Sequence, residues 1–282
     1  MGARSSYAEA GVVLLGAPMD WTTSFRPGAR HAPAAIRLVS QGLEEYSPYL
    51  DRDLDQCGFH DAGDLALPPG DVPGCLRAIA EACGRIVQDG KFPLLLGGEH
   101  LVSLPAVKRT AAGYPGLAVV QLDAHADLLD DYLGLSLSHA TVMRRVSEVV
   151  GEGNVFQFGV RSCTRPEVDY ARRHTRLSGL AGGALLSSLE ETLPYLQDRP
   201  VYVTLDIDVV DPAFAPGTGT AEPGGCTSRE ILLAVHLLAS LNLVGFDLVE
   251  VCPPYDQSQR TALLAAEIVR EVVLGTKGTP AR

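Results

Sequence analysis

Short apolar runs alternate with stretches of helical periodicity along almost the whole chain, and this alternation constrains the fold more than any other feature. The apolar runs are nearly continuous, which is typical of strands covered on both faces of a sheet. Strands that alternate with helices pair in parallel, because each helix returns the chain to the same end of the sheet. We therefore predict an α/β protein in which residues 1–282 form a single domain with three layers, α/β/α, around a mainly parallel sheet.

The predicted elements can be placed by residue range. Strands are expected at 12–16, 92–96, 117–122, 154–160, 200–207 and 243–251. Helices are expected at 33–40, 71–90, 101–111, 138–150, 188–197, 228–240 and 258–274. Asp71 is a suitable N-cap, and Thr227 with Glu230 matches a capping box. Residues 41–70 are rich in turn residues and are expected to be irregular, whereas the polar and aromatic segment 19–28 is a candidate pocket wall.

Composition excludes several classes of function. The chain has 23 Lys and Arg against 34 Asp and Glu, a formal charge of −11, and no basic cluster that suits a phosphate backbone. Nucleic acid is therefore not an expected partner, and a small cationic molecule fits better. No apolar run reaches membrane-spanning length, so no membrane partner is expected. The six cysteines form no Cys-x-x-Cys pair, which favours a reduced protein in the cytoplasm.

Three metal-binding side chains follow the apolar run 117–122. They are Asp123, His125 and Asp127, separated by two alanines. In an extended backbone, residues at positions i, i+2 and i+4 lie on one side of the strand. The spacing therefore predicts that these three side chains converge on one point where the strand ends.

Polar residues of the same kind end three other predicted strands. His100 follows the strand at 92–96, Asp206 and Asp208 close the strand at 200–207, and Glu250 lies near the end of the strand at 243–251. Ligands of open α/β sheets bind beyond the carboxyl ends of the strands. We therefore expect one site that collects residues far apart in the sequence.

The residue types in this site indicate a pair of metal ions. The predicted ligands are four carboxylates and two imidazoles: His100, Asp123, His125, Asp127, Asp206 and Asp208. This set favours a borderline-hard divalent ion, with manganese as the first choice, and the buried carboxylates require cations. Six ligands are too many for one open catalytic ion but suit two ions about 3.5–4 Å apart that share an activated hydroxide. We therefore expect two Mn²⁺ per subunit, with Asp123 as the bridge and with His125 and Asp127 on opposite ions.

Four sequence motifs resemble those of the ureohydrolases, the family of arginase and agmatinase. The motifs are Gly97-Gly98-Glu99-His100, Asp123-Ala124-His125-Ala126-Asp127, Ser138-His139 and the segment 206–220. The resemblance covers nearly the whole chain and implies an arginase-like fold with binuclear manganese on the six ligands above. It also implies that His139 handles protons near the leaving amine, that Glu250 pairs with the guanidinium, and that the protein is a homo-oligomer, most often a hexamer.

Three positions depart from the family pattern. Ala126 stands where Thr is common, Ala140 where Gly is usual, and Cys252 where Ala is common. None of them is a ligand position, so the predicted metal site is unchanged. We expect Ala140 to alter the loop at the far end of the substrate.

The segment before His139 favours one kind of guanidine. Residues 134–139 lack the Asn with which an arginase would hold an α-amino acid head, and Asp130 and Asp131 add negative charge. With His139 and Glu250, Asp130 is therefore a predicted substrate-binding residue. We expect a guanidine that ends in an amine: agmatine, cleaved to urea and putrescine by a hydroxide that Asp127 orients.

Other functions remain open at the level of sequence. Within the family, guanidinobutyrate or arginine are alternative substrates. A metal-dependent deacetylase of related architecture would need only one zinc, and a pseudoenzyme would keep the fold for assembly or regulation. Metal content distinguishes the deacetylase, and an assay of urea release distinguishes the pseudoenzyme.

Overall fold

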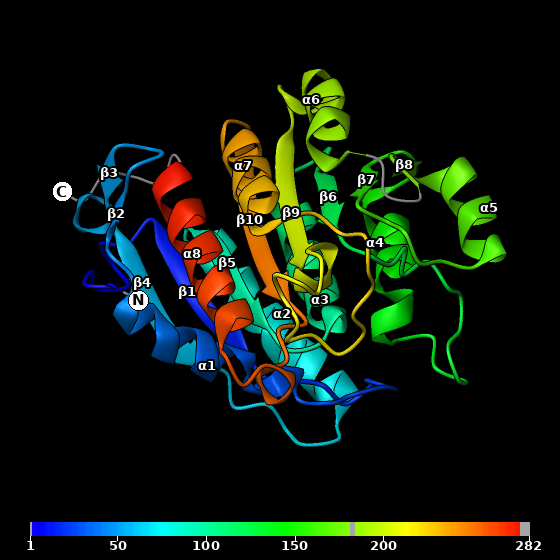
Figure 1. Cartoon of the computed structure of the whole chain (residues 1–282), viewed down its shortest axis with the longest axis horizontal. Coiled ribbons are helices and arrows are strands. Elements are labelled where there is room, and N and C mark those ends of the chain that lie inside the picture. Colours follow the sequence, from blue (N-terminus) through cyan, green and yellow to red (C-terminus); the bar gives the residue numbers. More distant parts are fainter. Residues whose placement is uncertain (1, 181–183, 277–282) are drawn as a thin grey trace.

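A single eight-stranded sheet forms the centre of the computed structural model, which describes residues 2–180 and 184–276 (Figure 1). In spatial order the strands are β4 (Phe59–Asp64), β1 (Val12–Ala17), β5 (Phe92–Gly97), β10 (Asn242–Val249), β9 (Pro200–Asp206), β6 (Ala118–Leu122), β7 (Val155–Phe158) and β8 (Arg176–Leu177). Every pair of neighbours in this sheet is parallel. The predicted parallel α/β fold is therefore confirmed.

Helices cover both faces of the sheet (Figure 1). They are α1 (Ala32–Val39), α2 (Val72–Gln88), α3 (Ser103–Gly113), α4 (Val142–Val150), α5 (Arg165–His174), α6 (Leu185–Leu196), α7 (Ser228–Ala239) and α8 (Arg260–Gly275). One apolar cluster joins α1, α6, α7 and α8 to one face, and a second joins α2, α3 and α4 to the other. Val12 belongs to the first cluster and Val13 to the second, because successive strand side chains point to opposite faces. The three layers follow from this alternation.

The predicted helix caps are present. The side chain of Asp71 accepts a hydrogen bond from the amide of Gly74 at 2.9 Å, and α2 begins at the next residue. Thr227 and Glu230 form the reciprocal bonds of a capping box at the start of α7. None of the described helices is both long enough and apolar enough to cross a bilayer.

Two parts of the prediction are corrected by the structure. Residues 41–70 are not uniformly irregular, because they contain β4 and a short antiparallel pair, β2 (Tyr46–Ser47) and β3 (Arg52–Asp53). The strand β4 was missed because it is an edge strand with four polar or glycine residues among its six. Residues 161–187 were assigned no element, yet they contain α5 and β8. The capping box of Thr164 and Glu167 was the available signal for α5.

The register of four adjacent strands brings the predicted site together. Leu96 of β5 lies opposite Leu248 of β10, and the next residue of β10, Val249, lies opposite Asp206 of β9. Leu122 of β6 lies opposite Leu205 of β9. Since these strands end at the same edge, the loops that follow them start side by side. The loops after β5 and β9 begin with short 3-10 turns, His100–Val102 and Ile207–Val209, whereas the loop after β6 ends with one, His139–Thr141.

Candidate metal centre and active site

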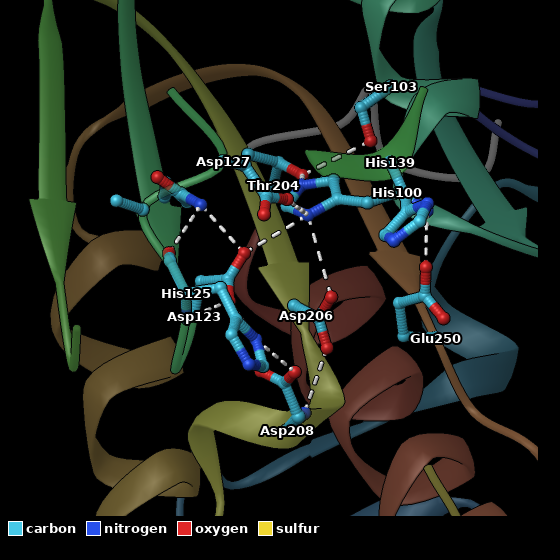
Figure 2. Close-up of polar contacts among 12 residues, drawn as sticks. His100, Ser103, Asp123, His125, Asp127, His139, Thr204, Asp206, Asp208 and Glu250 are labelled. Carbon is cyan, nitrogen blue, oxygen red and sulfur yellow. Dashed lines mark hydrogen bonds and ion pairs between the residues drawn. The ribbon is translucent and has the colours of Figure 1, made fainter. Parts of the chain in front are cut away.

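The imidazole of His100 faces three carboxylates (Figure 2). Its Nδ1 is 3.0 Å from an oxygen of Asp123, 3.0 Å from Asp127 and 3.5 Å from Asp206. The other ring nitrogen, Nε2, is 2.9 Å from the hydroxyl oxygen of Thr204. The side chain is only 1% exposed, so this half of the site lies inside the protein.

The imidazole of His125 occupies the second half of the site. Its Nδ1 is 2.9 Å from Asp208 and 3.6 Å from Asp123. Among the residues that the structure describes, its Nε2 has no hydrogen-bond partner, and the nearest carboxylate oxygen on that side, from Glu222, is 3.7 Å away. With 22% of its side chain exposed, His125 lies closer to solvent than His100 does.

Asp123 belongs to both halves. The ligand atoms of His100, Asp123 and Asp206 lie within 4.8 Å of one another, as do those of Asp123, His125 and Asp208. One oxygen of Asp123 accepts a hydrogen bond from the amide of His125, and the other accepts one from Gln121 Nε2, each at 2.6 Å. Its carboxylate is therefore held in place between the two histidines.

Two residues of the site have left-handed backbones. The φ angle is 53° at Asp127 and 61° at Glu250, a conformation that is unfavourable for side chains with a Cβ atom. The carbonyl of Asp127 accepts bonds from the amides of Met143 and Arg144 in the first turn of α4. The amide of Glu250 donates to the carbonyl of Gly98. These bonds hold both carboxylates at the edge of the sheet.

The electrostatics of the cluster fit a divalent metal. Burial, reinforced by the charges of neighbouring carboxylates, raises the pKa of Asp127 to about 7 and the pKa of Asp206 well above its ordinary value. Burial also opposes ionisation of Asp123, but the adjacent imidazoles of His100 and His125 lower its pKa. His100 Nδ1 is a buried nitrogen without a hydrogen-bond partner, although it faces oxygen atoms. Carboxylate oxygens and an imidazole nitrogen directed at one point form the donor set that a divalent cation requires.

Glu250 lies beside this cluster. Its Oε1 accepts a hydrogen bond from the amide of His100 at 2.8 Å, which turns the carboxylate toward the site. Burial, reinforced by the charge of Glu99, raises its pKa to about 8. A planar cation brought against this carboxylate would favour its ionised form.

His139 is held from the segment 19–28. Its amide donates to the hydroxyl of Thr22 at 3.1 Å, and that hydroxyl donates to Glu99 at 2.7 Å. The ring of Tyr132 packs edge-on against the imidazole, with ring centroids 5.4 Å apart. Burial lowers the pKa of His139 to about 4, so its imidazole is neutral at neutral pH.

A cavity of about 410 Å³ opens over these residues. Its inner surface is formed by six of the predicted site residues: His125, Asp127, His139, Asp206, Asp208 and Glu250. His100 and Asp123 lie beneath this surface. Ser24 and Phe25 line the cavity, as expected for the segment 19–28, and Ala140 lines it as well.

Asp130 is the one predicted site residue that the structure does not bring to the cavity. Its carboxylate is 68% exposed and pairs with Arg144 and Arg145, at 3.2 Å and 2.5 Å. The pairing directs its charge toward α4 and neutralises it. Sequence reasoning also missed Tyr132, Glu222 and Asp247, which contact or support the site. For Asp247 a signal existed, since a carboxylate within an apolar strand requires a partner.

The comparisons with known proteins define the class. The model of the arginase family matches residues 10–275, so this chain belongs to the arginase family. An agmatinase of Bacillus subtilis (strain 168) is 50% identical over 277 residues, which cover 98% of this chain and 95% of that protein. A guanidinobutyrase of Pseudomonas aeruginosa is 33% identical, over 95% of this chain and 87% of that protein. The crystal structure of the agmatine ureohydrolase of Thermoplasma volcanium superposes with a TM-score of 0.90 at 32% identity, covering 98% of this chain and 93% of that one.

Proposed function

We propose that this protein is an agmatinase, which hydrolyses the guanidinium group of agmatine to urea and putrescine. Identity of 50% to a bacterial agmatinase over nearly the full length of both chains supports the activity. The observation that carries the proposal is the floor of the cavity, where two clusters of histidine and aspartate that share Asp123 lie beside the partly buried carboxylate of Glu250. This arrangement provides a metal centre and a counterion for a guanidinium in one pocket.

The metal centre of this proposal holds two Mn²⁺ per subunit. One ion would be held by His100, Asp123, Asp127 and Asp206, and the other by Asp123, His125 and Asp208. A donor set rich in carboxylates favours manganese over a thiolate-loving metal. When bound, such a pair lowers the pKa of a shared water and stabilises negative charge that develops on the substrate.

Three residues of the site then have separate roles in the reaction. Glu250 binds and orients the guanidinium through charge-assisted hydrogen bonds. The carboxylate of Asp127 accepts a hydrogen bond from the attacking water and orients it toward the guanidinium carbon. As water adds to the guanidinium carbon, the bond from carbon to the alkyl nitrogen breaks, and that nitrogen gains a proton. The neutral imidazole of His139 relays the proton that the attacking water loses to this alkyl nitrogen. A group with a pKa of about 4 does not stay protonated at neutral pH.

The lining of the cavity favours a substrate with a cationic end. None of the described lining residues is Lys or Arg, whereas five are acidic: Asp127, Glu167, Asp206, Asp208 and Glu250. The terminal carboxylate of guanidinobutyrate would find no cationic side chain among these residues. Glu167, the acidic residue here that is neither a proposed metal ligand nor the counterion of the guanidinium, would attract the terminal ammonium of agmatine. The aromatic rings of Phe25 and Tyr132 offer further favourable contacts for an ammonium group.

The test is urea release from agmatine, guanidinobutyrate and arginine by the manganese-loaded protein and its variants. We expect agmatine to give the highest kcat/KM, Asp127→Asn to lower kcat, and Glu250→Ala to lower kcat/KM while manganese remains bound. Asp130→Asn is the matched control, because it removes a carboxylate of the same loop that lies outside the cavity. Preference for guanidinobutyrate would overturn the choice of substrate, and near-normal activity in both site variants would overturn the site.

The setting of the enzyme is part of the proposal. Putrescine as a product implies a role in polyamine biosynthesis. All six cysteines are free, which supports a reducing compartment such as the cytoplasm. The expected homo-oligomer stays a prediction that light scattering of the purified protein would test.

A further inference from the structure

A fully buried polar cluster contacts His100 at Nε2, the ring nitrogen that does not face the proposed metal centre; Figure 2 shows two of its members, Ser103 and Thr204. It consists of Ser103 on α3, Tyr202 and Thr204 on β9, and Asp247 on β10, each with no exposed surface. The proposed reaction does not use any of them. A buried carboxylate is unfavourable unless its hydrogen bonds are satisfied, so Asp247 requires an explanation.

The carboxylate of Asp247 accepts hydrogen bonds from three hydroxyl groups. One oxygen accepts from Thr204 Oγ1 at 2.6 Å and from Ser103 Oγ at 2.9 Å, and the other accepts from Tyr202 Oη at 2.8 Å. Among the described residues, no ion pair includes Asp247. Burial raises the pKa of Asp247, and the three hydroxyl donors oppose that rise; both carboxylate oxygens act as acceptors in these bonds. The direction of each of these bonds is therefore determined.

The direction of these hydrogen bonds determines which ring nitrogen of His100 donates to Thr204. Thr204 has a single hydroxyl proton and donates it to Asp247, so its oxygen is left to accept a hydrogen bond from His100 Nε2 at 2.9 Å. With the Nε2 proton so engaged, Nδ1 is the nitrogen that gives up its proton and offers a lone pair when His100 binds metal. Nδ1 is the nitrogen that faces Asp123, Asp127 and Asp206.

We propose that Asp247, acting through Thr204, is a positioning residue that holds His100 in the tautomer and orientation required to bind metal. The inference rests on the proposed metal centre. Histidine ligands to metals commonly donate their second nitrogen to a carboxylate or carbonyl, and loss of such a partner lowers metal affinity roughly 10- to 100-fold. Here a hydroxyl stands between the histidine and the carboxylate, and the strand pair β9 and β10 holds the chain of bonds in register, with Thr204 opposite Asp247.

Isosteric variants separate positioning from packing. Thr204→Val removes the bond to His100, Asp247→Asn removes the charge that orders the hydroxyls, and Thr204→Ser restores the bond. Tyr202→Phe is the matched control, because it removes a bond to the same carboxylate but leaves the path from Asp247 to His100 intact. The readouts are the dissociation constant for Mn²⁺ and the ¹⁵N NMR shifts of His100, which report its tautomer.

We expect Thr204→Val and Asp247→Asn to weaken the binding of one Mn²⁺ by roughly 10- to 100-fold, and Thr204→Ser and Tyr202→Phe to stay within about threefold of the wild type. In the metal-free wild type, the ¹⁵N shifts should show a proton on Nε2. Unchanged affinity in folded Thr204→Val, or an equal loss in Tyr202→Phe, would overturn the inference. A wild-type protein that binds no Mn²⁺ would instead overturn the proposed metal centre, and if Asp247→Asn does not fold, the two Thr204 variants still decide.

Discussion

The two histidines of the candidate metal centre are supported in opposite ways. His100 is 1% exposed, and its Nε2 bonds to Thr204, which belongs to a cluster buried between α3, β9 and β10. His125 is 22% exposed, its Nε2 has no hydrogen-bond partner, and Glu222 stands 3.7 Å away on a loop. The His100 half of the site thus lies in the protein core, whereas the His125 half lies at the edge of the site, next to the loop that contains Glu222.

The loop on the His125 side is itself fixed by an arginine. Arg161 Nη2 donates to the carbonyls of Asp208 and Glu222, each at 2.7 Å. The guanidinium of Arg161 therefore links Asp208, a proposed metal ligand, to Glu222, the residue that faces His125. Because these bonds hold the backbone and leave the side chain of Glu222 free to turn, we expect the His125 half to adjust when metal binds and the His100 half to be formed in advance.

The largest effect is expected where the two halves meet. Asp123→Asn removes the charge shared by both histidines, so both ions should be lost together. Several kcal/mol of metal-derived stabilisation would disappear, which corresponds to a fall in kcat/KM of at least about 10³-fold. Metal analysis and urea release measure this. Loss of only one ion would show that the halves are independent.

The second prediction concerns the stability of the metal-free protein. Burial raises the folded-state pKa of Asp127 to about 7 and of Glu250 to about 8, above their unfolded values. The folded state therefore binds more protons than the unfolded state between about pH 4 and pH 8, and stability falls as the pH rises. His139, with a lowered pKa, opposes this trend below about pH 6.5.

Thermal unfolding from pH 6.5 to 8 measures this trend. We expect Tm to fall by at least about 3 °C without metal and to recover with Mn²⁺, whose charge favours the ionised carboxylates. Glu250→Gln should flatten the decline. A metal-free Tm that rises over this range would contradict the raised pKa values of Asp127 and Glu250.

A smaller effect is expected from the rim. Glu222→Gln removes the only carboxylate that faces His125 Nε2 among the described residues, without disturbing the core. At 3.7 Å the contact is weaker than a hydrogen bond, so we expect Mn²⁺ affinity to fall roughly threefold to tenfold, less than in Thr204→Val. Calorimetric titration with Mn²⁺ compares the two variants. The reverse order would show that the rim, and not the core, determines affinity.

The smallest effect is expected from a residue that belongs to neither half. Asp130 is exposed and paired with Arg144 and Arg145, so Asp130→Asn should leave the thermal stability essentially unchanged. The KM for agmatine should change by less than about twofold. Steady-state urea release measures it, and a several-fold rise in KM would restore Asp130 to the substrate site.

Much of this arrangement could be predicted from sequence because it depends on strand ends. Apolar runs located the strands, and parallel pairing then placed the residues after β5, β6, β9 and β10 at one edge. The edge strand β4 escaped because its polar composition lacks that signal. Asp130 was misplaced and Glu222 was missed for a different reason: the direction of a loop side chain depends on partners such as Arg145, which no local pattern reveals.

We propose that two ions act together in a metal centre whose two halves share Asp123 as a ligand. The direct test is to titrate Mn²⁺ into the metal-free protein while counting bound metal and measuring urea release from agmatine. We predict that activity rises as the second ion binds and saturates at two manganese ions per chain. Full activity with a single bound ion, or a single tightly bound zinc, would contradict the account.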